Sequence, residues 1–291
     1  MKKLLFFDIS ELGWVRYLSA HLNYLKKQSN YIAICTNPSR HVFYRGFVDE
    51  ILPMPENYYK RFGHLQSDGN CLYSPEKDVI IDYKYVVSFF KSEFPNYEVI
   101  DEYSMFYGER VFEPYHHSKE SEEYCEKFRE VIIVFPRYRE SKFARRNIEK
   151  QNWVKTIKTL CEKYPQYDIL SIGGKSATYD INFDYNNYYN LINEENVLDI
   201  LICLCNTGRV ISTFGTESGI SLVATISKSN SFIVGEGKER ILYENFCNAN
   251  IKCHWVKESD DGYVIDDFDD ILKEFIKFTE LMIFLKNKKY L

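Results

Sequence analysis

Residues 210–224 read VISTFGTESGISLVA, and this stretch decides the fold class. An apolar run reaches small polar residues at Thr213, a turn is expected at Gly215, and a second apolar run follows from Gly219. A strand that turns directly into a helix presents backbone N–H groups at the helix start, where phosphate groups bind. Glu217, at the same junction, can accept hydrogen bonds from sugar hydroxyls. The stretch therefore indicates an α/β fold with a nucleotide-sugar site.

The composition narrows the class of protein. The chain has 291 residues, of which 45% are hydrophobic, enough for two α/β domains with sizeable cores. Its net charge of −5 disfavours a general nucleic-acid binder. The eight cysteines contain no Cys-x-x-Cys pair, so reduced thiols are expected rather than zinc ligands. The first apolar run ends at Asp8, too early for a signal peptide, and a cytoplasmic location is expected.

A first α/β pattern occupies the amino-terminal half. Short apolar segments with the length of buried strands alternate with a segment of helical periodicity. We expect strands at 4–9, 31–35 and 48–52, and a helix at 15–27. The polar, Tyr-rich segment 57–78 is expected to form loop and a short helix.

A second α/β pattern begins at residue 130. Strands are expected at 131–135, 167–172, 191–192, 209–212, 231–234 and 253–256, and helices at 152–164, 195–206, 219–227 and 268–285. The alternation of strands and helices is typical of parallel sheets covered by helices. We therefore predict two Rossmann-like domains, 1–129 and 130–267, with an interdomain cleft, followed by a helical segment at 268–291.

Basic and glycine residues follow two strands of the second half. Arg137 and Arg139 come directly after the strand at 131–135, and guanidinium groups suit phosphate oxygens. Gly173 and Gly174 end the next strand, where they would let a ligand approach the backbone. The alternatives are a solvated basic loop and an ordinary tight turn.

A third strand end, at 213–219, completes the predicted donor site. Carboxyl ends of parallel strands meet at one edge of a sheet, where α/β proteins bind ligands. Glu217 has an alternative role, because a carboxylate also stabilises a helix start. The predicted donor-binding residues are Arg137, Arg139, Gly173, Gly174, Thr213, Gly215, Thr216, Glu217, Ser218 and Gly219.

The first loop supplies the candidates for acid–base chemistry. Asp8 and Glu11 follow the first strand, and either carboxylate could remove a proton from an acceptor hydroxyl. The alternatives are a capping role for Asp8 and an exposed loop acid for Glu11. The pair His116-His117 has no carboxylate or cysteine partner at ligand spacing, so we expect no metal site.

The motifs resemble those of the GT-B glycosyltransferases, in particular the bacterial lipopolysaccharide heptosyltransferase-like family. Residues 10–15 (SELGWV) resemble its first-loop motif, and 47–52 (FVDEIL) resemble its Val-Asp-Glu-Ile strand. Residues 131–137, followed by Asn152-Trp153, resemble the strand, loop and helix start near the donor phosphates. Glu217-Ser218-Gly219 stands where the family usually has Asp-Thr-Gly. The resemblance implies donor binding in the C-terminal domain, acceptor binding in the N-terminal domain, no essential metal, and a last helix that packs back across both.

One departure from the family concerns the catalytic base. The family's first loop usually has Gly followed by Asp, and that Asp is taken as the base. Here Gly13 is followed by Trp14, so the base is Glu11 or Asp8, or the acceptor chemistry has changed.

We therefore predict a metal-independent glycosyltransferase of hexosyl- or heptosyltransferase type that serves polysaccharide biosynthesis. It would move a sugar from a nucleotide-diphosphate sugar to the hydroxyl of a glycan or lipid-linked acceptor. The nucleotide-diphosphate sugar is a co-substrate, and no cofactor is expected. The alternatives are a nucleotide-sugar epimerase-like enzyme and a non-catalytic nucleotide- or sugar-binding protein. The basic residues 286–289 after the last helical pattern give peripheral contact with an anionic membrane as an alternative to packing.

Overall fold

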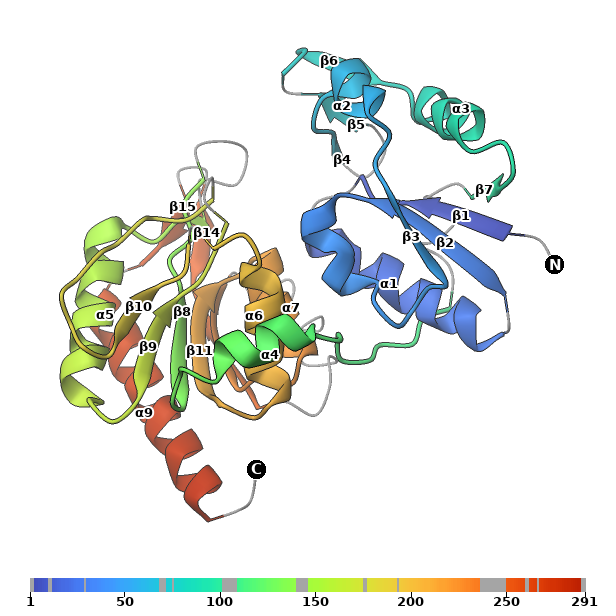
Figure 1. Cartoon of the computed structure of the whole chain (residues 1–291). Coiled ribbons are helices and arrows are strands. Elements are labelled where there is room, and N and C mark those ends of the chain that lie inside the picture. The colour runs from blue at the N-terminus through green and yellow to red at the C-terminus, as the bar shows by residue number, and fades with distance from the viewer. Residues whose placement is uncertain are drawn as a thin grey trace. The chain divides into compact units, whose positions relative to one another are not determined.

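The computed structural model describes residues 3–9, 12–28, 30–67, 72–74, 76–100, 109–139, 146–174, 177–192, 194–235, 250–259, 262–265 and 267–288. The chain forms two compact units, Met1–His116 and His117–Leu291 (Figure 1). Each unit has its own parallel sheet and its own helices, so each is described by itself.

The first unit is built on a four-stranded parallel sheet of order β3-β2-β1-β7. Its strands are β1 (Lys3–Phe7), β2 (Tyr31–Thr36), β3 (Glu50–Pro53) and β7 (Glu98–Val99). The helical segments are α1 (Leu12–Lys27), the 3-10 helix η1 (Pro38–Phe43), α2 (Asn57–Phe62) and α3 (Tyr83–Glu93).

Helices cover both faces of this sheet (Figure 1). α1 lies on one face, and α2 and α3 lie on the other, where Phe7 stacks on Phe90 with ring centroids 4.3 Å apart. Because both faces are covered, the strands are apolar throughout rather than alternating.

A small antiparallel sheet lies where only loop and a short helix were expected. Its strands are β4 (Gln66–Ser67), β5 (Leu72–Ser74) and β6 (Val79–Ile81). The short helix was correct, since α2 falls in this segment. Strands this short show no readable alternation in a sequence, so tertiary pairing alone reveals them.

The second unit is built on a six-stranded parallel sheet of order β10-β9-β8-β11-β12-β13. Its strands are β8 (Val131–Phe135), β9 (Asp168–Ser171), β10 (Tyr188–Asn190), β11 (Val210–Thr216), β12 (Ser231–Gly235) and β13 (Ile251–Trp255). An antiparallel hairpin follows, formed by β14 (Lys257–Ser259) and β15 (Gly262–Val264). Chain order reverses between β8 and β11, which is the switch point of a Rossmann sheet.

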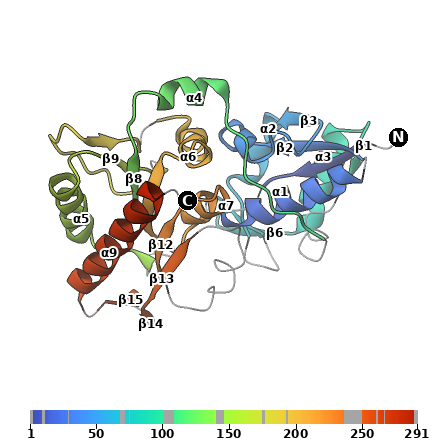
Figure 2. The ribbon, with the colours of Figure 1, turned by 90° about the horizontal axis from the view of Figure 1, so that it is seen from below.

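Five helices belong to the second unit in the part of the chain that is described. Figure 2 shows α5 and α9 on one face and α6 and α7 on the other, with α4 beside α6. Their bounds are α4 (Lys119–Cys125), α5 (Lys150–Lys163), α6 (Val197–Asn206), α7 (Gly219–Ile226) and α9 (Phe268–Asn287). The core under α5 and α9 is aromatic: Phe214 lies between Trp153 and Phe275, with centroid distances of 5.2 and 4.7 Å.

Two predicted boundaries differ from the structure. The sequence assigned 1–129 to the first domain, but α4 packs on α6, where the Ser118 N–H donates to Asp199 at 3.0 Å, so α4 belongs to the second unit. The strand predicted at 191–192 is wrong. Tyr188–Asn190 make the ladder with β9, and the apolar pair after them is buried and adds only one hydrogen bond to that strand, from the Leu191 N–H to Ser171 O at 2.9 Å. Helix α9 packs on the second sheet through its buried face.

Candidate functional site

The ends of β8 and β11 lie side by side at the switch point of the second sheet. The two strands pair from Val210 with Val131 to Gly215 with Phe135, so their carboxyl ends are adjacent. Arg137 follows β8 and Glu217 follows β11. Open α/β sheets bind ligands in the crevice at this position. The structure therefore brings together the basic and acidic residues that the sequence singled out on two separate strands.

The predicted turn at Gly215 is wrong, because β11 continues through Thr216 and the chain turns at Glu217-Ser218. Gly215 serves close packing instead. A Cβ at this position would lie 2.8 Å from Ser221 Oγ and 2.9 Å from Phe135 Cδ2. The prediction was wrong because small residues occur both in turns and in tightly packed strands, and the sequence alone does not distinguish the two.

Arg137 is held by a short ladder and by one amide side chain. The Tyr138 N–H donates to Ala177 O at 3.0 Å, and the Tyr179 N–H donates to Pro136 O at 2.8 Å. Arg137 Nη1 donates to Asn147 Oδ1 at 2.8 Å, and only 7% of the surface of Arg137 is exposed. The loop therefore fixes this arginine before any ligand arrives.

Asn147 also fixes Arg139. Its Nδ2 donates to Arg139 O at 2.8 Å, and its Oδ1 accepts from the Arg139 N–H at 3.1 Å. Asn147 is not among the residues predicted from the sequence, because nothing in the polar run around it marks an amide that closes a loop. The side chain of Arg139 is half-buried.

Glu217 is buried at the end of β11, with 1% of its surface exposed. The Tyr263 hydroxyl donates to Glu217 Oε2 at 3.2 Å, and the Glu217 N–H donates to Val234 O at 3.0 Å. The carboxyl group lies over Gly235, where a Cβ would come within 2.3 Å of Glu217 Cδ. Gly235 thus provides the space that this carboxylate occupies.

Four residues form what we call the charged cluster: Arg137, Arg146, Glu217 and Tyr263. Burial and the neighbouring Glu217 carboxylate raise the pKa of Tyr263, whereas the positive charges of Arg146 and Arg137 lower it. The Tyr263 hydroxyl therefore interacts electrostatically with Glu217, Arg146 and Arg137. The cluster combines guanidinium groups, which suit phosphate, with a carboxylate, which suits hydroxyl groups.

Helix α7 begins beside this cluster. Ser218 is its N-cap, and the side-chain Oγ accepts from the Ser221 N–H at 3.4 Å. The first amides of a helix have no acceptor within the helix, and they carry the positive end of its dipole. Ser218 and Gly219 are half-buried. The helix start thus adds N–H donors to the positive charge of the arginines.

The two glycines after β9 have different roles. A Cβ on Gly173 would lie 2.0 Å from Thr178 Oγ1, so the chain itself occupies the space at Gly173. A Cβ on Gly174 would meet no atom of the described residues within 4 Å, and Gly174 is exposed. Gly174 is the one of the pair that leaves its surroundings open to a ligand.

This difference gives a stability prediction. We expect Gly173→Ala to lower the free energy of unfolding by about 1–3 kcal/mol, because the new methyl group displaces Thr178. Gly174→Ala is the matched control and should stay within about 0.5 kcal/mol of the wild type. Urea unfolding of both variants measures the effect. Equal stability of the two variants would contradict the packing role of Gly173.

The two predicted threonines lie inside the second unit. Thr213 is 1% exposed, and its hydroxyl donates to Ser231 Oγ at 3.0 Å within the sheet. Thr216 is fully buried, and its carbonyl oxygen accepts from Ser221 Oγ at 2.8 Å. Thr213 links β11 to β12, and Thr216 supports the junction between β11 and α7. Contact of either residue with a donor stays a prediction.

Asp8 follows β1 in the first unit and is buried, with 2% of its surface exposed. Arg40 Nη1 lies 2.8 Å from Asp8 Oδ1, and Thr36 Oγ1 donates to Asp8 Oδ2 at 3.1 Å. Burial and the charge of the neighbouring Asp8 carboxylate raise the pKa of Tyr44. Asp8 therefore holds η1, which carries Arg40, against the end of β1. Glu11 lies outside the described residues.

The two adjacent histidines belong to different surroundings. The ring of His116 lies 5.6 Å from that of Phe47 and against Gly46. His117 Nδ1 lies 3.2 Å from Asn206 Nδ2. Within the described ranges, no group of three or more His, Cys, Asp or Glu side chains is arranged to hold a metal ion.

No protein-family model matches the chain, and no curated protein matches it in sequence. Solved structures do match. The ADP-heptose LPS heptosyltransferase II of E. coli has a TM-score of 0.62 and 14% identity, covering 97% of this chain and 99% of that one. A family 9 glycosyl transferase from Veillonella parvula has a TM-score of 0.56 and 11% identity, with coverages of 99% and 96%. The E. coli heptosyltransferase WaaC, solved with ADP, has a TM-score of 0.53 and 8% identity, with coverages of 95% and 99%.

These similarities extend over nearly the full length of each structure. They confirm the predicted α/β fold class and show that the chain has the fold of GT-B glycosyltransferases such as the heptosyltransferases. The resemblance inferred from the motifs is thus confirmed at the level of the fold. Function must be argued from the site, because one fold hosts many activities.

Proposed function

We propose that the chain is a glycosyltransferase that binds a nucleotide-diphosphate sugar at the carboxyl ends of β8 and β11. The observation that carries this proposal is the charged cluster at the switch point, in which a half-buried phenol donates to Glu217 and interacts electrostatically with Arg137 and Arg146. A diphosphate needs positive charge and N–H donors, and a sugar needs a hydrogen-bond acceptor. The E. coli heptosyltransferase of the same fold, solved with ADP, supports a nucleotide as the ligand.

The proposed reaction is the transfer of a hexosyl or heptosyl group. The acceptor hydroxyl oxygen bonds to the anomeric carbon of the donor sugar, and the bond from that carbon to the diphosphate oxygen breaks. The nucleoside diphosphate leaves with both electrons of that bond, and the hydroxyl proton passes to a carboxylate. Arg137, Arg139 and the start of α7 would stabilise the leaving diphosphate, a role that many enzymes give to a metal ion. Glu217 would accept a hydrogen bond from a donor hydroxyl.

The first unit would bind the acceptor, a glycan or a lipid-linked sugar, and supply the base. Both oxygens of Asp8 already accept hydrogen bonds, from Arg40 and from Thr36, which weakens Asp8 as a proton acceptor. We therefore favour Glu11 as the base and assign Asp8 to holding Arg40. The second candidate function is a non-catalytic nucleotide-sugar-binding protein. It is favoured by the same observation, because an Asp8 whose two oxygens are hydrogen-bonded is a poor catalytic base.

A panel of nucleotide sugars tests the proposal. The protein is incubated with uridine, guanosine, cytidine and adenosine diphosphate sugars, with a thermal-shift measurement and product analysis for each. Release of a nucleoside diphosphate supports a transferase. A thermal shift without turnover supports the binding protein, an isomerised donor indicates an epimerase-like enzyme, and no shift with any donor overturns the nucleotide-sugar site.

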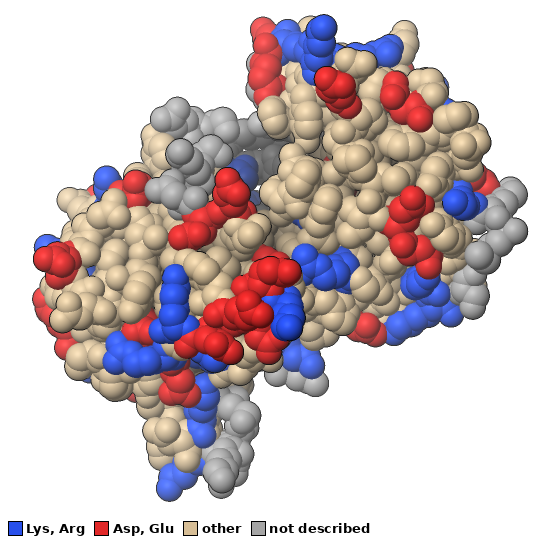
Figure 3. Space-filling view, viewed as in Figure 1, with Lys and Arg blue, Asp and Glu red and all other residues tan. Residues whose placement is uncertain are grey.

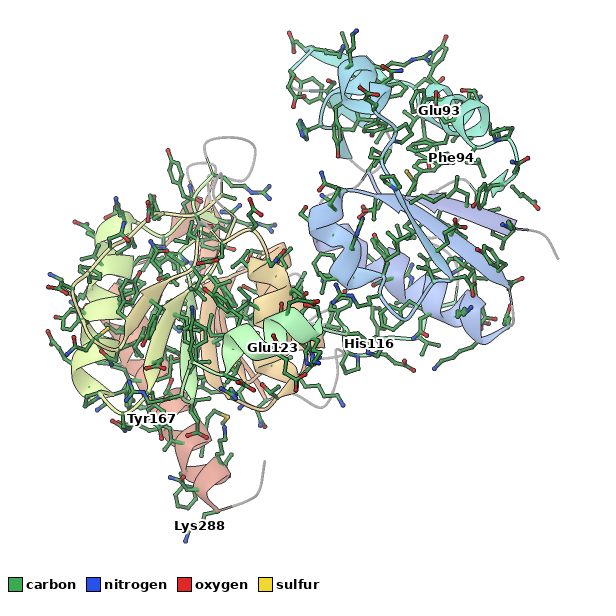
Figure 4. All side chains as sticks on the ribbon, in the orientation of Figure 1. Glu93, Phe94, His116, Glu123, Tyr167 and Lys288 are labelled. Atoms are coloured by element: carbon green, nitrogen blue, oxygen red, sulfur yellow. The ribbon has the colours of Figure 1, made fainter. Side chains whose placement is uncertain are left out.

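We also propose that the end of α9 contacts an anionic membrane on the cytoplasmic side. Lys277, Leu281, Phe284 and Lys288 recur at helical spacing, and Leu281 and Phe284 are 50% and 55% exposed. Lys side chains lie beside uncharged atoms on this end of the helix (Figure 3), and Lys288 extends from it (Figure 4). Within the described part of the chain, no helix has the length and hydropathy of a bilayer span.

Vesicle sedimentation measures this contact. We expect the protein to bind phosphatidylglycerol vesicles more strongly than phosphatidylcholine vesicles, because the flanking lysines are attracted to anionic lipid headgroups. The double variant Leu281→Asp/Phe284→Asp should lower the bound fraction about tenfold, since it removes the apolar contact and adds negative charge. Tyr85→Asp, at a side chain that is 65% exposed in the first unit, is the control. Unchanged sedimentation of the double variant contradicts the proposal.

A further inference from the structure

The β14–β15 hairpin brings one side chain to the proposed donor site. In this hairpin Glu258 pairs with Tyr263, and the Tyr263 ring packs against the core under α5 and α9. Its hydroxyl reaches Glu217 Oε2 at 3.2 Å. A phenol whose ring is held by the core and whose hydroxyl meets a buried carboxylate is well suited to fix the orientation of that carboxylate.

Glu217 is constrained on a second side by the neighbouring strand. Its carboxyl group lies over Gly235, the last residue of β12, and its N–H is bonded to Val234 O at 3.0 Å. The guanidinium groups of Arg137 and Arg146 are near enough to Tyr263 to affect it electrostatically. The hydrogen bond from the Tyr263 hydroxyl and the contact with Gly235 therefore constrain the Glu217 carboxylate from two sides.

We propose that Tyr263 is a positioning residue of the donor site, which acts through Glu217 on the sugar part of the donor. This inference rests on the proposed function. The phenol occupies one carboxylate oxygen and thereby fixes the orientation in which Glu217 accepts a hydrogen bond from a sugar hydroxyl. The diphosphate is bound by Arg137 and the start of α7, so it does not depend on Tyr263.

The test separates the sugar from the diphosphate. Calorimetry measures the affinity of the full-length wild type and of Tyr263→Phe for the best nucleotide sugar of the panel and for its free nucleoside diphosphate. We expect Tyr263→Phe to weaken nucleotide-sugar binding about tenfold, the loss of one hydrogen bond to a charged group. Binding of the free nucleoside diphosphate should change by less than about twofold, because no diphosphate contact is removed.

Two further variants sharpen the result. Tyr164→Phe is the matched control: Tyr164 is a buried tyrosine of the same unit whose hydroxyl has no hydrogen-bond partner among the described residues. It should leave both affinities unchanged. Glu217→Gln combined with Tyr263→Phe should weaken sugar binding no further than Glu217→Gln alone, because the phenol acts only through the carboxylate.

The outcomes distinguish the two proposals. If the wild type binds neither a nucleotide sugar nor a nucleoside diphosphate, the proposed function fails and the role of Tyr263 fails with it. If the wild type binds both and Tyr263→Phe behaves like the wild type, only the positioning role is overturned. An equal loss of both affinities in Tyr263→Phe also overturns it, since that result indicates a general disturbance of the site.

Discussion

Replacing Arg137 with alanine is expected to lower kcat/KM for the nucleotide sugar about 100- to 1000-fold, the usual cost of removing one group that stabilises developing negative charge. The guanidinium is buried and fixed by Asn147, so it meets the diphosphate without a large ordering cost. Negative charge grows on the diphosphate as the bond to the sugar breaks. The loss should therefore appear in kcat as well as in KM. Steady-state kinetics with the donor found by the panel measures both.

Two variants serve as controls for this result. Arg137→Lys keeps the charge but loses the paired N–H donors, so an intermediate loss is expected. Arg209→Ala removes a guanidinium that donates to Cys125 O and Phe128 O, both at 2.7 Å, next to the amino end of β11. It should lower stability and leave kcat/KM of the folded protein unchanged. Full activity of Arg137→Ala would contradict the proposal that Arg137 binds the diphosphate.

The second large effect is expected at Glu11. Glu11→Gln should reduce kcat about 100- to 10,000-fold, the typical contribution of a general base. Binding of the donor should stay unchanged, because donor contacts are assigned to the second unit. The pH dependence of kcat gives an independent check. The limb that reports deprotonation of the base in the wild type should disappear in the variant.

Asp8→Asn separates the base from the residue that holds Arg40. Removing the charge opposite Arg40 should lower the free energy of unfolding by about 1–3 kcal/mol, because a hydrogen-bonded buried carboxylate loses its charged partner. If Asp8→Asn keeps its stability but loses turnover as strongly as Glu11→Gln is expected to, then Asp8 is the base. Wild-type turnover in both variants would favour the non-catalytic binding protein.

The sequence predicted most helices and strands of both sheets because their apolar periodicity is local. Strand β8, for example, is a continuous apolar run, and α5 follows the helical spacing expected at 152–164. The arginine and the glutamate of the site could also be found, since each stands directly after such a run. Where the pattern was short or ambiguous, as at β4 to β6 and at Gly215, the prediction was wrong.

The sequence by itself determined the class of fold and the two strand ends that carry the candidate site, because burial of strands and helices is encoded by repeats of a few residues. Only the tertiary structure decided what surrounds those ends. In the folded chain, Asn147 binds the guanidinium of Arg137, and Thr178 occupies the space beside Gly173. Tyr263, 46 residues from Glu217 in the sequence, donates a hydrogen bond to the Glu217 carboxylate. Such contacts depend on how distant segments pack, and no local pattern records them.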